Sequence, residues 1–191
     1  MPFSEVMLAR PLDKKFVFEP GVFAVEEKLD GIRIECEISS GASNLFTQKL
    51  ITPWSRYGRV HPLPTHIMEE LAKFPPSILD GEIFVAGKRS YGAVELTNLP
   101  DLEFRVFDIL ELEGTPVTDL NYDQRRQLLC SFIPLNGCVT LNPSFNVDTM
   151  EQVYKIRDEI WARDGEGLIL KWRNASYQIG KRSKDWIKIN N

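Results

Sequence analysis

Residues 26–33 read EEKLDGIR, and this stretch is the best guide to the fold and chemistry of the 191-residue chain. Lys28 stands two residues before an Asp30-Gly31 turn, and Arg33 follows the turn. Such a turn can hold a lysine amine at the mouth of a pocket, while the arginine brings positive charge to a phosphate. A protonated lysine is a weak nucleophile, so this chemistry needs a lowered pKa or a metal ion that helps the amine lose its proton. Taken alone, the stretch also fits an exposed surface turn, because short motifs produce false matches.

The composition is that of an ordinary soluble globular protein. The chain is 43% hydrophobic and 26% charged, which suits one domain with a proper core. No segment has the length of a membrane span, and the N-terminus lacks the apolar stretch of a signal peptide. The three cysteines have no metal-ligand spacing and are odd in number, so we expect a reducing cytosol rather than a disulfide framework. The net charge of −4 argues against nucleic-acid binding by the whole surface, but not by a local basic face.

Hydrophobic patterning predicts an α+β domain with mainly antiparallel sheets flanked by helices. Strands are expected at 22–26, 32–38, 77–85, 102–110, 166–172 and 185–189, and helices at 65–74, at 122–132 and from a capping box of Asp148 and Glu151 to Gly165. Thr65 is expected to cap the first helix. The alternation of residues 32–38 places Arg33 off the core face and Lys28 between two antiparallel strands. A Rossmann fold is excluded, because no glycine-rich turn joins a strand to a helix and no P-loop is present.

Further segments carry the polar groups that a nucleotide site needs. Arg56, in the turn at 55–58, could clamp a phosphate or a ribose. Glu82, on the polar face of the 77–85 strand, could accept from ribose hydroxyls or help to hold a metal ion. Phe107 could stack on a base. Each also has an ordinary interpretation, as a surface loop, a solvated carboxylate or a core phenylalanine.

Two C-terminal segments add charges at strand positions. Glu166 and Lys171 stand at the two ends of an apolar strand, where they suit a Mg²⁺ ligand and a phosphate-binding amine. Strict alternation puts them on opposite faces, so a twist, a bulge or a strand that begins after Glu166 is needed if both reach one site. Trp186 and Lys188 share one face of the last strand. Taken singly, these charges are strand ends that reach solvent.

Together and in this order, the segments resemble the motifs of the covalent nucleotidyltransferase superfamily, and specifically the adenylation domain of ATP-dependent DNA ligases. The resemblance rests on EEKLDGIR (26–33), SRYG (55–58), Glu82, Phe107 with Asp108, EGLILK (166–171) and Trp186 to Lys188, with Val6–Ala9 and Asn121–Leu129 similar to phage and bacterial ligases. It covers essentially the whole chain. It implies one adenylation domain at 1–191, with a nucleotidyltransferase (ATP-grasp-like) fold.

The resemblance implies a role for each motif residue. Lys28 attacks the α-phosphorus of ATP, forms a lysine-AMP and releases pyrophosphate; AMP then passes to the 5′-phosphate of nicked duplex DNA. The other implied roles are Glu26 and Phe107 on adenine, Arg33 and Arg56 on ribose, phosphate or the DNA 5′-phosphate, Glu82 on ribose and metal, Glu166 on metal, and Lys171 and Lys188 on the α-phosphate. The implied cofactors are ATP and Mg²⁺ or Mn²⁺. A monomer without membrane contact is expected, in the cytosol of a bacterium or a phage-infected cell.

Two features depart from the family pattern. Asn190 stands where the last motif usually has a second lysine, so one α-phosphate contact is in question. The chain also ends at Asn191, with no OB-fold domain after the adenylation domain. We therefore expect the chain alone to seal nicks weakly, in a salt-sensitive manner, or not at all, because the grip on a duplex comes from many phosphate contacts. The candidates for a local basic patch are Lys181, Arg182, Lys184 and Lys188.

Three alternatives stay open at this stage. A messenger-RNA capping guanylyltransferase shares the lysine motif but uses GTP, and an RNA ligase uses ATP on a different nicked substrate. The sequences at 166–171 and 55–58 favour a ligase over the capping enzyme. A non-catalytic ligase-like module would bind nucleotide or DNA without chemistry. The joint presence of Lys28, Glu82, Glu166 and Lys171 speaks against that module.

Overall fold

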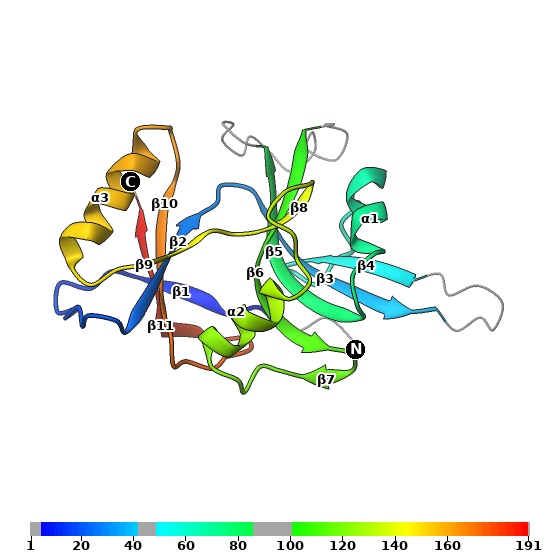
Figure 1. The fold of residues 1–191 in the computed structure, drawn as a ribbon, viewed down its shortest axis with the longest axis horizontal. Coiled ribbons are helices and arrows are strands. Elements are labelled where there is room, and N and C mark those ends of the chain that lie inside the picture. Colours follow the sequence, from blue (N-terminus) through cyan, green and yellow to red (C-terminus); the bar gives the residue numbers. More distant parts are fainter. Residues whose placement is uncertain (1–4, 42–48, 86–100, 191) are drawn as a thin grey trace.

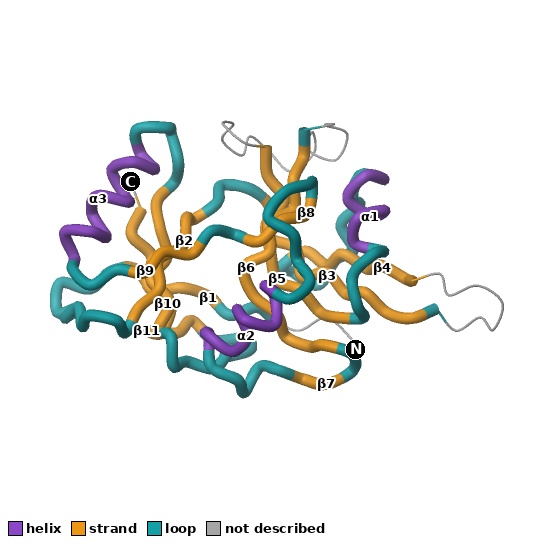
Figure 2. The backbone as a smooth tube through the Cα atoms, in the orientation of Figure 1, coloured by secondary structure: helices purple, strands orange, loops and turns teal. Residues whose placement is uncertain are grey.

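The computed structural model describes residues 5–41, 49–85 and 101–190, and its strands form two sheets. Sheet A contains β1 (Leu8–Pro11), β2 (Phe23–Lys28), β9 (Ser144–Asn146), β10 (Gly167–Trp172) and β11 (Arg182–Asn190). Sheet B contains β3 (Ile32–Ser40), β4 (Lys49–Ser55), β5 (Ser77–Val85), β6 (Leu102–Leu112), β7 (Thr115–Pro116) and β8 (Val139–Leu141). The helices of the described residues are α1 (Thr65–Leu71), α2 (Tyr122–Cys130) and α3 (Met150–Trp161). The two sheets lie next to each other; α3 and α1 lie toward opposite ends of the molecule, and α2 lies near the middle of the view (Figures 1 and 2).

The pairing of the strands confirms the α+β class with mainly antiparallel sheets. The order in sheet A is β1-β11-β10-β2-β9, and the order in sheet B is β4-β3-β5-β6-β7, with β8 beside β6. Two pairs are parallel, β1 with β11 and β6 with β8. The others are antiparallel. In the described part of the chain, no helix is long and apolar enough to cross a membrane.

Among the strands described, the chain passes between the two sheets at two short crossings. Residues 29–31 lead from β2 to β3, and residues 142–143 lead from β8 back to β9. Figure 1 shows both crossings, the first in blue and the second in yellow, between the two sheets. The whole of sheet B is therefore an insertion between two strands of sheet A.

The first crossing corrects the expectation that Lys28 lies between two paired strands. β2 pairs with β10 and β9, whereas β3 pairs with β4 and β5. The alternation in the sequence identifies the buried face of each strand but not the strand beside it. Gly31 allows the crossing to run close to β5, because a Cβ there would collide with the carbonyl oxygen of Ile83.

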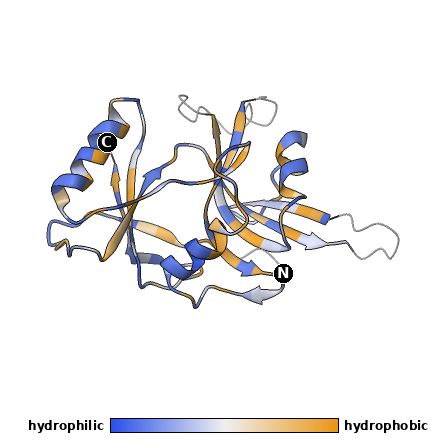
Figure 3. Cartoon of the chain, in the orientation of Figure 1, coloured by the Kyte–Doolittle hydropathy of each residue, from blue (hydrophilic) through white to orange (hydrophobic). Residues whose placement is uncertain are grey.

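Each sheet has its own hydrophobic core. The predicted alternation of β3 is confirmed, since Ile34, Cys36 and Ile38 are buried in the core of sheet B, together with Ile67 and Leu71 of α1. The outer face of sheet A is covered by α3, which buries Val153 and Ile160 against Leu168 and Leu170. Coloured by hydropathy, α3 is mainly hydrophilic with hydrophobic residues between, as expected for a helix that buries one stripe (Figure 3).

The start of α1 differs from the sequence expectation. Thr65 is the first helical residue rather than the cap, and Pro64 occupies the N-cap position without a side-chain hydrogen bond. Proline fits at a helix start because its missing N–H would have no partner there. The helix is also shorter than predicted and ends at Leu71.

The capping box of α3 lies one residue later than predicted. Thr149 is the N-cap, and its hydroxyl accepts from the Gln152 N–H while the Gln152 side chain accepts from the Thr149 N–H. The pair Asp148 and Glu151 matches the same sequence pattern in the neighbouring register, so pattern alone could not separate the two. The helix ends at Trp161, before Gly165, and the left-handed residue that follows it is Asp164, at φ 62°.

Candidate active site between the two sheets

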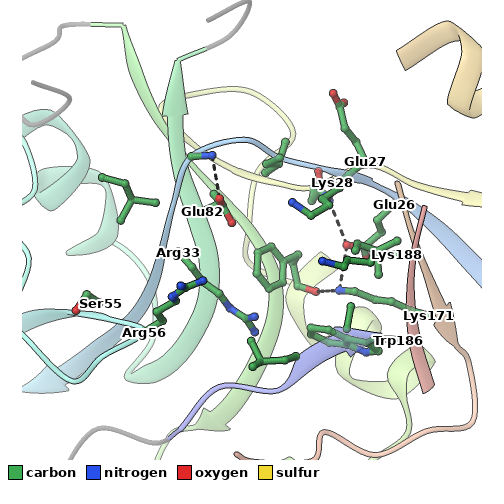
Figure 4. A pocket seen from close by; sticks show the side chains of 18 of the residues that line it. Glu26, Glu27, Lys28, Arg33, Ser55, Arg56, Glu82, Lys171, Trp186 and Lys188 are labelled. Carbon is green, nitrogen blue, oxygen red and sulfur yellow. Dashed lines mark hydrogen bonds and ion pairs between the residues drawn. The ribbon is translucent and has the colours of Figure 1, made fainter. Parts of the chain in front are cut away.

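A cleft of about 580 Å³ lies between the sheets. Both sheets and both crossings contribute to its lining. The predicted site residues in the lining are Glu26, Lys28, Arg33, Arg56, Glu82, Phe107, Lys171 and Lys188. Glu166 lies outside the lining, but its carboxylate contacts Lys28. The structure therefore brings all the predicted site residues to one place, from segments that are far apart in the sequence. Figure 4 labels these residues, with the exception of Phe107 and Glu166.

Lys28 and Glu166 form an ion pair that we call the rim pair. Lys28 is the last residue of β2, and its side chain is 24% exposed; that of Glu166 is 30% exposed. β10 begins at Gly167, which is paired with Lys28, so Glu166 precedes the strand and turns toward the amine. Gly167 has φ +150°, and a Cβ there would collide with the Ile189 carbonyl. A twist, a bulge or a strand that begins after Glu166 could bring Glu166 and Lys171 to one site. In the structure, the strand begins after Glu166.

Glu82 approaches Lys28 from sheet B. Its carboxylate accepts a hydrogen bond from the Gly31 N–H at 2.9 Å, which joins β5 to the first crossing. Burial raises the pKa of Glu82 to about 7, although the charges of Lys28 and Arg33 and the Gly31 N–H lower it; the Glu166 carboxylate raises it. The carboxyl can therefore change its protonation near neutral pH.

The carboxylates around Lys28 suit a hard divalent cation. In the described part of the chain, no group of three or more His, Cys, Asp or Glu side chains is arranged as a metal cage. Glu82 in β5 and Glu166, just before β10, nevertheless act on the same amine from opposite sides of the cleft. Mg²⁺ in nucleotide sites is usually held by one or two carboxylates together with substrate phosphates and water. Two oxygen donors therefore fit Mg²⁺ in the presence of a nucleotide.

Arg33 is fixed to the wall of the cleft by a buried carboxylate. Its Nε and Nη2 donate to the two oxygens of Asp80 at 2.9 and 2.6 Å, and Tyr177 donates its hydroxyl proton to Asp80 at 2.7 Å. Burial disfavours the guanidinium charge, but Asp80 outweighs it and raises the pKa of Arg33 above its usual value. The guanidinium lies 5.2 Å from the centre of the Phe107 ring. Arg33 therefore contributes a permanent positive charge whose strongest donors are already occupied.

Lys171 and Glu26 form a second ion pair, the floor pair. Their side chains are each 2% exposed, and Lys171 Nζ lies 3.0 Å from Glu26 Oε2. The ammonium also donates to the Phe107 carbonyl at 2.9 Å and lies 4.4 Å from the centre of the Trp186 ring and 4.8 Å from that of Phe107. Figure 4 shows Lys171 pointing to Glu26 beside Trp186. In this arrangement Lys171 builds the floor of the cleft; its predicted contact with the α-phosphate stays a prediction.

Besides an ion pair with Arg126 Nη1 at 3.7 Å, two residues that the sequence did not single out donate hydrogen bonds to Glu26. Tyr122 donates its hydroxyl proton to Glu26 Oε1 at 2.6 Å, and Asn142 donates from Nδ2 to Glu26 Oε2 at 3.1 Å. Burial and the Glu26 carboxylate raise the pKa of Tyr122 well above its usual value. These partners lie 96 and 116 residues from Glu26 along the chain. No local pattern could have predicted them.

The remaining basic residues of the prediction differ in how exposed their side chains are and in which partners they contact. Arg56 is exposed in the turn after β4 and contacts the ring and hydroxyl of Tyr57. Lys188 is half-buried in the cleft, and within the described residues its side chain has no hydrogen bond or ion pair. The predicted basic patch is divided: Arg182 lines the cleft, whereas Lys184 lines a second hollow. Asn190 is exposed at the end of β11, opposite Gly167.

A family model described as "ATP dependent DNA ligase domain" matches residues 6–190. The chain belongs to the ATP-dependent DNA ligase domain family. Among curated ligases, it is 27% identical over 184 residues to a DNA ligase of Methanothrix thermoacetophila, a match that covers 88% of this chain and 32% of that protein. It is 30% identical over 191 residues to DNA ligase 4 of Saccharomyces cerevisiae, a match that covers 87% of this chain and 20% of that protein. The chain thus spans a third or less of these two ligases.

Solved ligase structures share the fold. A mycobacterial DNA ligase D, solved in complex with ATP, superposes with a TM-score of 0.70 at 26% identity, covering 98% of this chain and 60% of that chain. A Lig E DNA ligase superposes with a TM-score of 0.73 at 21% identity, covering 99% of this chain and 69% of that chain. The predicted nucleotidyltransferase fold of the ligase family is therefore confirmed.

Proposed function

We propose that this ligase domain takes AMP from ATP onto Lys28 and passes it to the 5′-phosphate of nicked duplex DNA. The observation that carries the proposal is the position of the Lys28 amine. It lies in the cleft between sheets, in contact with Glu166 and within the field of Glu82, and it is accessible to a ligand. Family membership over residues 6–190 supports the same activity.

The chemistry is an in-line phosphoryl transfer. Lys28 Nζ gives its proton to the Glu166 carboxylate that it contacts, and its lone pair forms a bond to the α-phosphorus of ATP. The bond between the α-phosphorus and the bridging oxygen breaks, and pyrophosphate leaves with that electron pair. Such transfers depend mainly on positioning and charge stabilisation. Lys188, whose side chain is unpaired within the described residues, is the cation best placed to bind the α-phosphate.

The nucleotide has a matching set of contacts. The half-buried Phe107 ring gives the base an aromatic surface, and Glu82 is placed for the ribose or for a metal ion. Mg²⁺ or Mn²⁺ held by Glu82 and Glu166 would neutralise charge on the phosphates. Arg56 and Arg182 lie at the cleft, where they suit contacts with ATP phosphates or with the DNA 5′-phosphate. One copy of the chain contains all these groups, so the proposal needs only a monomer.

Covalent labelling tests the proposal. The chain is incubated with Mg²⁺ and ATP labelled at the α-phosphate, and we expect an acid-resistant label that hydroxylamine removes at acid pH. Lys28→Ala should abolish the label, because no other amine can replace Lys28 in its place. Lys28→Arg should abolish it as well, because a guanidinium stays protonated at working pH. Lys184→Ala is the matched control, since this lysine lines the second hollow and should keep the label.

The outcomes separate the alternatives. A label that persists in Lys28→Ala would contradict the assignment of the nucleophile. Labelling by GTP in preference to ATP would point to a guanylyltransferase. Binding of ATP without a label would leave a non-catalytic module. Transfer of the label to nicked RNA in preference to nicked DNA would point to an RNA ligase.

A further inference from the structure

Asn142 is held rigidly at the second crossing. Its backbone N–H donates to the Val106 carbonyl at 2.7 Å, and its side-chain Nδ2 donates to Glu26 Oε2 and to the Glu27 carbonyl, each at 3.1 Å. Both side-chain partners are acceptors, so the amide can only present its NH₂ group to them. This fixes the position of the other end of the amide, the oxygen Oδ1.

The Oδ1 oxygen of Asn142 has no hydrogen-bond partner within the described part of the chain, although the atom is buried. Asn142 is 1% exposed and lines the cleft. A buried acceptor that lacks a donor carries the full penalty of its lost hydration. A ligand that brings a donor to this oxygen therefore gains an interaction that water does not already supply.

The neighbouring acceptors are already in use. Glu26 Oε1 accepts from Tyr122, and Glu26 Oε2 accepts from Asn142 and Lys171. The Glu27 carbonyl also accepts from Asn142. Of the acceptors in this cluster, Asn142 Oδ1 is therefore the one whose capacity is unused.

The cluster lies beside the surface proposed for the base. Lys171 connects the Asn142 cluster with Phe107, because its ammonium binds both Glu26 and the backbone carbonyl of Phe107. The same ammonium lies 4.8 Å from the centre of the Phe107 ring, so the edge of a purine stacked on that ring would lie near Glu26 and Asn142. The 6-position of adenine carries an amino group, which is a donor, whereas the 6-position of guanine carries an oxygen, which is an acceptor.

We propose that Asn142 Oδ1 accepts a hydrogen bond from the 6-amino group of adenine and thereby selects ATP over GTP. This role rests on the proposed function and adds its base specificity. Guanine would place its 6-oxygen against Asn142 Oδ1. Both atoms are acceptors, so no hydrogen bond could form between them. Glu26, which the sequence suggested as the adenine-binding residue, then acts on the base through Asn142, because it helps to fix the amide.

The test compares three nucleotides that differ at the 6-position: ATP, purine riboside triphosphate, which has hydrogen there, and GTP. Binding is measured by calorimetry in a Lys28→Ala background, which prevents covalent attachment. We expect ATP to bind at least about tenfold more tightly than the purine analogue, since a site built around a ligand N–H rejects the analogue that lacks it. In Asn142→Ala and Asn142→Leu, this ratio should fall to within about threefold.

Ser144→Ala is the matched control. Its hydroxyl bonds with Tyr122 in the same cluster, at 2.9 Å, but does not provide the proposed acceptor. The control should therefore keep the ratio of the parent chain. If the Asn142 variants fail to fold, the parent chain still decides, because equal affinities for ATP and the purine analogue would overturn the role of Asn142.

The result is separable from the proposed function. Labelling of Lys28 by ATP together with an unchanged ratio in Asn142→Leu would overturn this inference and leave the adenylation standing. A ratio that depends on Asn142 without any label on the parent chain would support the inference and overturn the adenylation. A chain that binds none of the three nucleotides would overturn both.

Discussion

The rim pair and the floor pair contain the same two chemical groups in different surroundings. In the rim pair, the side chains of Lys28 and Glu166 are 24% and 30% exposed. In the floor pair, those of Lys171 and Glu26 are both 2% exposed. An exposed pair contributes little to stability because water competes for both charges, whereas breaking a buried pair leaves an uncompensated charge. Burial, rather than residue type, therefore decides which lysine is free to react.

The difference in burial also gives the two lysines of the cleft, Lys28 and Lys171, different structural roles. The rim pair is partly exposed, so the amine of Lys28, the nucleophile of the proposed reaction, separates from Glu166 at little cost. Lys171 is enclosed by the rings of Phe107, Tyr122 and Trp186, and its ammonium is bound to two oxygens. A side chain held in this way positions its neighbours. Variants that act on each pair separately can test the comparison.

The largest effect is expected from the floor pair. Lys171→Ala removes the nearer of the two cations of the buried Glu26 carboxylate and leaves only Arg126, at 3.7 Å, so we expect the free energy of unfolding to fall by up to about 3–5 kcal/mol. Denaturant titration of the unliganded chain measures this value. Lys188→Ala is the control, because this lysine lies on the neighbouring strand and has no side-chain partner within the described residues. A loss below about 1 kcal/mol in Lys171→Ala would mean that burial does not distinguish the two pairs.

The next effect is a pH dependence that arises beside the rim pair. The pKa of Glu82 is raised from 4.5 to about 7 in the folded chain, so between these values the folded state holds a proton that the unfolded state has lost. Stability should therefore fall as the pH rises from 4.5 to 7, by up to about 3 kcal/mol for this group. Thermal unfolding of the parent chain and of Glu82→Gln across this range measures the effect. If the stability of the parent chain and that of Glu82→Gln depended on pH in the same way, the pH dependence would not come from Glu82.

The aromatic surface above the floor pair should contribute to nucleotide affinity. Phe107→Ala should weaken ATP binding by about 1–3 kcal/mol if the ring stacks on adenine, and Phe107→Tyr or Phe107→Trp should retain much of the affinity. Calorimetric titration with ATP provides the measurement. If Phe107 only packs in the interior, Phe107→Ala will lower the melting temperature and leave the ATP affinity of the folded protein unchanged.

The smallest change in stability is expected at the rim. Glu166→Ala should alter the free energy of unfolding by less than about 1 kcal/mol, because the pair is partly exposed. The same variant should slow the labelling of Lys28, since the amine loses its nearest carboxylate. Rapid-quench labelling and denaturant titration on one preparation measure both. A large loss of stability, or labelling at the parent rate, would contradict the separation of the two pairs.

The residues that the sequence proposes for the site gather in one cleft, whereas the connections between the sheets differ from the sequence expectation. Alternation correctly identifies the buried faces of β3 and β5, and it places Trp186 and Lys188 on one face of β11, from which both line the cleft. Alternation does not name the neighbouring strand, so the passage of the chain from one sheet to the other after Lys28 could not be foreseen. The short strands β7, β8 and β9 have two or three residues, too few for a period to emerge.

The buried partners were missed for a different reason. Tyr122, Asn142 and Tyr177 act on Glu26, Asp80 and Arg33 from at least 96 residues away along the chain. The sequence around each of these residues contains no pattern that would indicate the contact. Only Asp80 has a signal in the sequence, because it stands two residues before Glu82 and strand alternation puts both carboxylates on the same face.

The two crossings also set the order in which the domain can assemble. Sheet B comes from one continuous stretch, from β3 to β8, whereas sheet A must bring β1 and β2 together with strands that begin at residue 144. Closing that long loop costs entropy until sheet B has shortened the distance between its ends. During synthesis from the N-terminus, sheet B can form while Lys171, Trp186 and Lys188 are still absent. The cleft is therefore the last part of the domain to be completed, and the proposed nucleotide site stays incomplete until β11 is in place.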